Sequence, residues 1–318
     1  MLSVIIPAYN EEKNIERAQA TISGILTEAG ISHELIFVDD GSKDGTWGEI
    51  TRLSTYTGDH SDAPSSSDSD RMTGITRGIS FSRNFGKESA IYAGLAEARG
   101  DCSVVIDCDL QHPPVKIVEM YRLWGDGYEI VEGVKTSRGK ESAGHGFAAR
   151  IFYRLISNAT GIDMSNASDF KLLDSKAVNV ILNMKEKNSF FRALSAWVGF
   201  KTTQVEYEVQ ERVEGSSKWS TKSLISYAIT NLTSFTSIPL QIVTILGLLM
   251  FVIGMVFSVI TLYQWAHHSS VEGFTTVIIL QCFSSSIIMM SLGIIGYYIA
   301  KIYEEIKHRP KYIISHRT

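Results

Sequence analysis

Two aspartates stand one residue apart in the stretch "VVIDCDLQHPP", which begins at residue 104. In an extended segment, residues i and i+2 point to the same side of the chain, so the carboxylates of Asp107 and Asp109 would lie beside each other. Gln111 adds an amide oxygen one alternation later. Oxygen ligands of this kind suit a hard divalent cation, Mg²⁺ or Mn²⁺. The alternative is a solvated strand end before a helix that starts at Pro113 and Pro114.

Polar clusters also end three other apolar runs. They are "PAYNEE" at the end of residues 2–8, "DDGSKDGT" after 34–39 and "SRNFGKE" after 74–80. Further apolar runs at 102–107 and 128–134 make five short strands, and the helical patterns that alternate with them cover 11–29, 42–53, 87–98 and 113–124. This alternation predicts a mostly parallel α/β sheet with helices on both faces. Ligands bind beyond the carboxyl ends of such strands, so four polar clusters on one rim predict a site.

The rim residues match the needs of an enzyme that uses a nucleotide sugar. Such an enzyme needs a group that reads the base, a divalent cation at the diphosphate and basic residues nearby. Asp39 can accept from a ring N–H of uracil, and Asp40 shapes the turn that follows. His112 is interpreted as a structural hydrogen-bonding residue rather than as a ligand. Lys135 and Arg138 in "GVKTSRGK" are candidates for holding an acceptor phosphate, with a solvated basic loop as the alternative.

The apolar content of the 318-residue chain is concentrated near its C-terminal end. Hydrophobic residues make up 44% of the chain and the mean hydropathy is +0.04. Residues 242–263 and 274–300 contain no charged side chain. About 20 apolar residues cross the hydrocarbon core of a bilayer, and both runs exceed the usual length of a core helix. We therefore predict two transmembrane helices rather than two buried core helices.

Basic residues avoid the linker between these runs. "QWAHHSSVEG" has no Lys or Arg, whereas the tail "KIYEEIKHRPKYIISHRT" is basic and Lys218 and Lys222 precede the first run. The positive-inside rule then places both ends in the cytoplasm, and "MLSVIIPAYNEE" lacks the features of a signal peptide. We expect a multi-pass protein of the plasma membrane with a cytoplasmic catalytic domain. The predicted parts are that domain at 1–220, an interfacial amphipathic helix at 221–240, spans at 241–264 and 274–300, and a cytoplasmic tail at 301–318. A helix packed on the sheet is the alternative for 221–240.

Charge, cysteines and glycines exclude several classes of protein. The net charge of −4 argues against a nucleic-acid partner. The three cysteines show no spacing typical of a metal site, and a cytoplasmic domain would keep them reduced. The first strand is not followed by Gly-x-Gly-x-x-Gly, which a dinucleotide-binding dehydrogenase would need.

Six ordered motifs resemble one known family. They are "VIIPAYNEEKNI", "VDDGSKDGT", "RNFGKESA", "DCDLQHPP", "SDFKLLD" and "ERVEGSSKW". In this order, followed by two apolar runs, they resemble the family 2 inverting glycosyltransferases that make polyprenyl-phosphate sugars. The resemblance covers nearly the whole chain and is greatest to the bactoprenol glucosyltransferase branch, with dolichyl-phosphate mannose synthase more distant. It implies a GT-A fold, an Asp-x-Asp metal motif, a UDP-sugar donor with glucose as the first expectation, and undecaprenyl phosphate or a similar acceptor.

The resemblance also implies roles for individual residues. It assigns the nucleotide to Pro7, Tyr9, Glu11 and Asp39, with Asp40 beside them, and the metal and diphosphate to Asp107, Asp109 and Gln111. Arg212 and Lys218 would close over the diphosphate and the acceptor, with membrane anchoring as the alternative for Lys218. Asp169 matches a family aspartate near the sugar, with a structural hydrogen-bonding role as the alternative. Lys171 stands where the family has Arg, and no role is assigned to it.

The chemistry of the acceptor sets the expected mechanism. A lipid phosphate is already an anion at neutral pH, so it can attack the anomeric carbon without a strong base, and positioning and charge neutralisation matter most. One alternative is a processive polysaccharide synthase, whose Gln-x-x-Arg-Trp motif has imperfect echoes in "QERV" and "FFRALSAW". Another is a non-catalytic, membrane-tethered nucleotide-sugar-binding protein, which predicts a damaged metal motif. The sequence leaves homo-oligomerisation and the identity of the sugar open.

Overall fold

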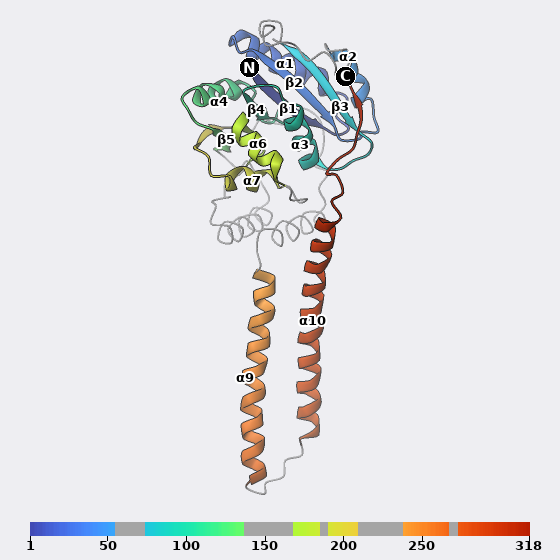
Figure 1. Cartoon of the computed structure of the whole chain (residues 1–318), viewed down its shortest axis with the longest axis vertical. Coiled ribbons are helices and arrows are strands. Elements are labelled where there is room, and N and C mark those ends of the chain that lie inside the picture. The colour runs from blue at the N-terminus through green and yellow to red at the C-terminus, as the bar shows by residue number, and fades with distance from the viewer. Residues whose placement is uncertain (55–73, 137–167, 185–189, 209–237, 267–272) are drawn as a thin grey trace. The chain divides into compact units, whose positions relative to one another are not determined.

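The computed structural model describes residues 1–54, 74–136, 168–184, 190–208, 238–266 and 273–318 (Figure 1). The chain divides into two compact units, each described by itself. One comprises Met1–Ser220 with Arg309–Thr318, and the other comprises Thr221–His308.

The first unit is built on a mixed, mostly parallel sheet. Within the described residues it has eight strands in the order β7-β5-β6-β4-β1-β2-β3-β8. Their bounds are β1 Leu2–Ala8, β2 His33–Asp39, β3 Ile75–Phe81, β4 Cys102–Val105, β5 Ile130–Lys135, β6 Lys171–Asp174, β7 Thr202–Tyr207 and β8 Ile314–Arg317. Four adjacent strands, β4, β1, β2 and β3, are parallel, while β6 and β8 run antiparallel to their neighbours.

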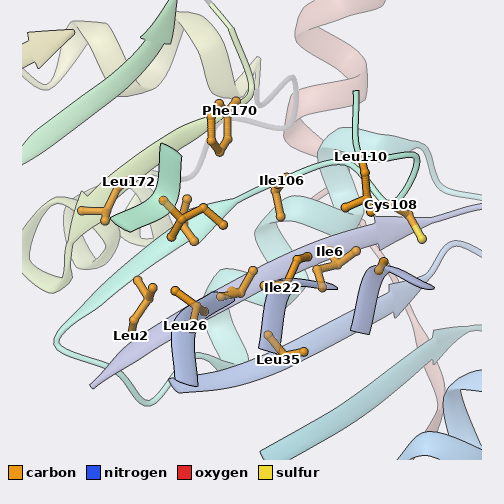
Figure 2. Packing of buried hydrophobic residues seen from close by; sticks show 14 of the residues in the cluster. Leu2, Ile6, Ile22, Leu26, Leu35, Ile106, Cys108, Leu110, Phe170 and Leu172 are labelled. Atoms are coloured by element: carbon orange, nitrogen blue, oxygen red, sulfur yellow. The ribbon is translucent and has the colours of Figure 1, made fainter. Parts of the chain in front are cut away.

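Helices connect and cover these strands. Their bounds are α1 Ile15–Glu28, α2 Thr46–Leu53, α3 Lys87–Glu97, α4 Val115–Gly125, α6 Ser175–Asn183 and α7 Phe191–Trp197. Helix α1 buries Ile15, Ala18, Ile22 and Leu26, whose spacing of three and four residues forms one apolar face. Figure 2 shows Ile22 and Leu26 packed with Leu2, Ile6 and Leu35 of the sheet. Cys108 and Leu110, which follow β4, belong to the same core.

The predicted fold class is confirmed. The five predicted strands and four predicted helices are present, with ends that differ by a few residues. Strand β4 ends at Val105, two residues before the predicted end, and the main chain then turns. Strands β6, β7 and β8 and helices α6 and α7 were not predicted.

Strand β8 completes the sheet from the far end of the sequence. It pairs antiparallel with β3, and Figure 1 marks both ends of the chain at this sheet. The Thr318 hydroxyl accepts from the Gly78 amide at 2.8 Å, and Arg317 forms an ion pair with Glu97 at 2.9 Å. The strand thus covers the outer edge of β3, which would otherwise expose unpaired backbone groups.

The second unit contains two long helices, α9 Ile238–Ala266 and α10 Phe274–Ile306. Leu240–Ile260 and Ile279–Ile306 are long and apolar enough to cross a membrane, and neither stretch is buried within the protein. Large apolar side chains of both helices, such as Leu248 and Met289, are exposed. Helices that are apolar all round are typical of membrane spans. The predicted interfacial helix lies outside the described residues apart from its last three positions.

Candidate active site

The carboxyl ends of β1, β2 and β3 lie level with one another. Ala8, Asp39 and Ser80 occupy matching positions on β1, β2 and β3. Ile5 of β1 pairs with Val105, the last residue of β4. The four polar clusters therefore leave the sheet from one edge, which is called the carboxyl edge below.

Asp39 is held by its neighbours at this edge. Its Oδ2 accepts from the Ser80 hydroxyl at 2.7 Å, and its Oδ1 accepts from the Ser42 amide at 2.9 Å. The side chain is buried. A carboxylate has about four acceptor positions, so Asp39 keeps capacity for a further donor. Contact with a nucleoside stays a prediction.

Asp40 supports the loop that follows β3. Its carboxylate accepts from the amides of Phe85 at 2.6 Å and Gly86 at 2.9 Å, just before α3. Burial raises the pKa of Asp40 to about 6, although these amides act to lower it. The next residue, Gly41, has φ +66°, and a Cβ there would clash with the backbone of Arg83. Since backbone amides occupy both carboxylate oxygens, the structure gives Asp40 a loop-holding role, and nucleotide contact stays a prediction.

The loop after β1 is fastened to the loop after β2. The Glu11 amide donates to the Thr46 hydroxyl at 2.9 Å, and Glu11 Oε2 accepts from the Asn14 side chain at 2.6 Å. Asn10, at φ +54°, accepts from the Lys43 amide at 2.9 Å. The residues predicted to bind the nucleoside are Pro7, near the end of β1, and Tyr9 and Glu11 in this loop, and all three are partly exposed.

The Asp-x-Asp segment alternates as its sequence predicts. Cys108 and Leu110 are buried, whereas Asp107, Asp109 and Gln111 are partly exposed. The alternation runs through a turn rather than a strand, because the Leu110 amide donates to the Asp107 carbonyl at 3.3 Å and Leu110 has φ +55°. Asp109 Oδ1 accepts from the Gln111 amide at 3.1 Å.

The donors of this segment fit a hard cation. Two carboxylates and one amide lie on its partly exposed side, and all three offer oxygen atoms. Among the residues that the structure describes, no group of three His, Cys, Asp or Glu side chains is arranged as a metal site. A cation here would therefore take its remaining ligands from water or from the diphosphate, as Mg²⁺ commonly does.

A lysine bridges two carboxylates at the carboxyl edge. Lys87, the first residue of α3, places Nζ 2.6 Å from Asp107 Oδ1 and 2.9 Å from Asp169 Oδ2. Arg192 of α7 also binds Asp169, with Nε 2.7 Å from Oδ1 and a second nitrogen 2.8 Å from Oδ2. One network of ion pairs thus joins the segment after β4, helices α3 and α7, and the segment before β6.

These contacts set the charge states of the network. Burial acts to raise the pKa of Asp169, but the charges of Lys87 and Arg192 outweigh it and hold that pKa well below its usual value. For Asp107 the effect of burial is likewise outweighed by Lys87, and the pKa is lowered. Burial opposes the charged form of Lys87, yet the two aspartates raise its pKa above the usual value. All three groups are ionised at neutral pH.

Glu88 lies beside this network and titrates near neutrality. It accepts from the Phe191 amide at 2.9 Å, which ties α3 to the start of α7. Burial and the nearby charge of Asp169 raise the pKa of Glu88 to about 7.

His112 packs against two aromatic side chains, and its role as a hydrogen-bonding residue rather than a metal ligand stays a prediction. Its ring stacks on Phe170 at 5.2 Å and meets Tyr207 edge-on at 5.4 Å. Burial lowers the pKa of His112, and the charge of Lys135 acts in the same direction. Nδ1 lies 3.9 Å from Asp107 Oδ2 and has no hydrogen-bond partner among the described residues.

Of the remaining predicted site residues, the structure describes only Lys135. Lys135 is the exposed last residue of β5. Arg138, Arg212 and Lys218 lie outside the described residues. Lys87 and Arg192 were not among the predicted site residues. Lys87 stands in the quoted motif "RNFGKESA" directly after a polar loop, which is a signal that could have identified it, whereas the sequence carries no sign that Arg192 binds Asp169.

Residues 3–179 match the family described as Glycosyl transferase family 2. The uncharacterized glycosyltransferase YkcC of Bacillus subtilis is 38% identical, over 98% of this chain and 93% of the relative. The bactoprenol glucosyl transferase of Shigella phage SfII is 32% identical, over 99% of this chain and 98% of the relative.

Among solved structures, the chain is similar to glucosyl-3-phosphoglycerate synthase from Mycobacterium tuberculosis in complex with Mn²⁺, UDP and phosphoglyceric acid. The identity is 20%, the coverage is 72% of this chain and 74% of that chain, and the TM-score is 0.47. The family match spans more than half of the chain, and relatives at 38% and 32% identity align with it almost from end to end. The chain therefore belongs to glycosyl transferase family 2 and is a glycosyltransferase.

Proposed function

We propose that this enzyme moves a monosaccharide from a nucleotide sugar to a polyprenyl phosphate at the cytoplasmic face of the membrane, with inversion at the anomeric carbon. UDP-glucose and undecaprenyl phosphate are the first candidates. The observation that carries the proposal is the pair of partly exposed carboxylates, Asp107 and Asp109, at the carboxyl edge of a chain that aligns with a bactoprenol glucosyl transferase over 99% of its length. Two helices apolar enough to cross a membrane support a lipid acceptor.

The carboxyl edge offers groups for each part of the donor. Asp39 would accept from the base, with Pro7, Tyr9 and Glu11 bordering the nucleoside. Asp107, Asp109 and Gln111 would hold Mg²⁺ or Mn²⁺, which when bound would neutralise the diphosphate leaving group. Lys87 and Arg192 keep Asp169 ionised and fixed beside them. The protein then contributes mainly orientation and a prearranged set of charges.

The acceptor needs little activation. A phosphate monoester is an anion at neutral pH, so its oxygen attacks the anomeric carbon while the bond from that carbon to the UDP oxygen breaks. This single displacement inverts the anomeric centre and leaves UDP with the electron pair. Lys135, together with Arg138, Arg212 and Lys218, would bind the acceptor phosphate and close over the diphosphate.

A lipid-linked monosaccharide is the expected product. Membranes that contain the protein should transfer labelled sugar from a nucleotide donor to an added short polyprenyl phosphate, and the label should be extractable into organic solvent and released by mild acid. A panel of nucleotide sugars identifies the donor. Label that appears only in long, water-soluble polymer would instead support a processive polysaccharide synthase.

The sheet itself supports the proposed topology. Strand β8 follows both apolar helices in the sequence yet pairs with β3, which precedes them. The two strands must lie on the same side of any membrane that the helices cross, so the number of crossings is even. The lack of Lys and Arg in "QWAHHSSVEG" supports a linker on the far side of the membrane.

Cysteine labelling tests this topology. In intact cells, an impermeant maleimide should label a Ser269→Cys variant, because residue 269 lies in the linker. A Ser217→Cys variant should be labelled only after the cells are opened. Cys102 and Cys108 are buried, and the unmodified protein, which also carries Cys282 in α10, measures the background labelling. Labelling of the Ser217→Cys variant in intact cells would contradict the proposed topology.

A further inference from the structure

Lys87 contacts two carboxylates, and these two groups differ in their exposure and in their other partners. Asp169 is 6% exposed and is bound by both Lys87 and Arg192. Asp107 is 28% exposed and faces Lys87, with His112 3.9 Å away. Among the described residues, Asp169 would keep Arg192 at 2.7 Å if Lys87 moved, whereas Asp107 would keep no ion-pair partner closer than His112.

The Lys87 side chain is also placed where a ligand can reach it. It is 42% exposed, although its amino group lies between two carboxylates. A lysine carries one compact charge on a flexible four-carbon stem, so Nζ can change partners while the backbone stays in place. The backbone here is fixed, because the loop before α3 is held by Asp40 and the next residue, Glu88, is tied to α7.

We propose that Lys87 is a displaceable counter-ion, which neutralises Asp107 in the metal-free enzyme and turns to the phosphate oxygens of the nucleotide when a divalent cation takes its place at Asp107. This inference rests on the proposed function, because it needs the cation site and a diphosphate donor. Asp169 remains paired with Arg192 throughout, so the exchange leaves no buried carboxylate without a partner.

The exchange makes cation and nucleotide binding cooperative. A cation that binds alone must first separate Lys87 from Asp107, so its affinity is low. Once a nucleotide offers phosphate oxygens to Lys87, that cost falls and the cation binds more tightly. Because linkage is reciprocal, the cation must raise the nucleotide's affinity by the same factor.

The Lys87→Met variant tests the exchange directly, because Met keeps the length of the stem and removes the charge. Mn²⁺ binding is measured by electron paramagnetic resonance on the purified full-length protein in detergent, with and without UDP. Without UDP, the variant should bind Mn²⁺ at least about fivefold more tightly than the wild type, the lower end of the usual range for coupled sites. With UDP, it should bind Mn²⁺ no more tightly than the wild type, so the enhancement by UDP shrinks by the same factor.

Arg192→Met is the matched control, since it removes a cation that binds Asp169 without contacting Asp107. Its effect on Mn²⁺ affinity should be smaller, and its UDP enhancement should stay. Lys87→Gln, which can still donate hydrogen bonds, is used if Lys87→Met does not fold. An unchanged UDP enhancement in the Lys87 variants, or an equal effect in Arg192→Met, would overturn the exchange while the proposed function stands. A wild type that binds no Mn²⁺, with or without UDP, would contradict both.

Discussion

Replacing Asp109 by Asn should lower the rate of sugar transfer by at least about a hundredfold. A bound metal stabilises a transition state by several kcal/mol. Each loss of about 1.4 kcal/mol of that stabilisation lowers the rate tenfold. Asn keeps the size of the side chain but removes the negative charge that offsets a hard cation. The fold should survive, since the amide oxygen of the new side chain can still accept from the Gln111 backbone, as Asp109 Oδ1 does at 3.1 Å.

Initial rates with purified enzyme, polyprenyl phosphate and excess Mg²⁺ measure this loss. Asp101→Asn is the matched control: Asp101 precedes β4 at the opposite edge of the sheet, is largely exposed and pairs with the N-terminal amine. That variant should transfer sugar normally. A chelator should silence the wild type, and Mg²⁺ or Mn²⁺ should restore it. If Asp109→Asn transfers sugar at nearly the wild-type rate, or if a chelator does not affect the wild type, the two carboxylates do not bind a catalytic cation and only form a solvated turn.

Replacing Lys171 by Met should instead destabilise the protein, by about 3 kcal/mol, the lower end for breaking a buried ion pair. Lys171 is fully buried in β6, and its Nζ binds Glu132 of β5 at 2.6 Å and the Ser195 hydroxyl at 2.7 Å. Glu132 is 12% exposed, so the substitution would leave a nearly buried carboxylate without its cation. For a domain of this size the thermal midpoint should fall by roughly 6–12 °C.

Thermal unfolding in detergent, followed by intrinsic fluorescence, measures this effect. Lys116→Met is the matched control, because Lys116 pairs with Glu119 on the surface of α4 and such pairs contribute little. Its midpoint should stay near that of the wild type. The double variant Lys171→Met with Glu132→Gln removes both charges and should recover part of the loss. If the two lysine variants unfold at the same temperature, the buried pair contributes no more than the surface pair.

The sequence predicts β1 to β5 because these strands are apolar runs followed by polar residues. It does not predict β6, β7 and β8, because their patterns are weak. Strand β6 has four residues and carries a buried charge, Lys171. In β7 only Val205 and Tyr207 are buried, so it has no apolar run. Strand β8 lies in a tail whose charge suggested only exposure to the cytoplasm.

The same distinction applies to the candidate site. Asp107, Asp109 and Gln111 share one side because they alternate over a few residues, and local spacing is enough to predict this. The network around Asp169 is tertiary: Lys87 is 82 residues away and Arg192 is 23 residues away. Asp40 shows that local sequence can also suggest a role that tertiary contacts do not support. Its position suggested a ligand contact, but its carboxylate binds backbone amides 45 and 46 residues away.

The position of β8 also constrains the order of events during biosynthesis. A ribosome releases β8 only after both apolar helices, so β3 emerges long before its partner, and Gly78 and Thr318 are 240 residues apart. Contacts between such distant residues form late, because a long loop must close first. Until then the nascent catalytic unit has an open strand edge that can pair with other chains. We therefore expect chains whose helices fail to insert to aggregate through β3, and chaperones to be needed until insertion brings β8 to the side of the membrane that holds β3.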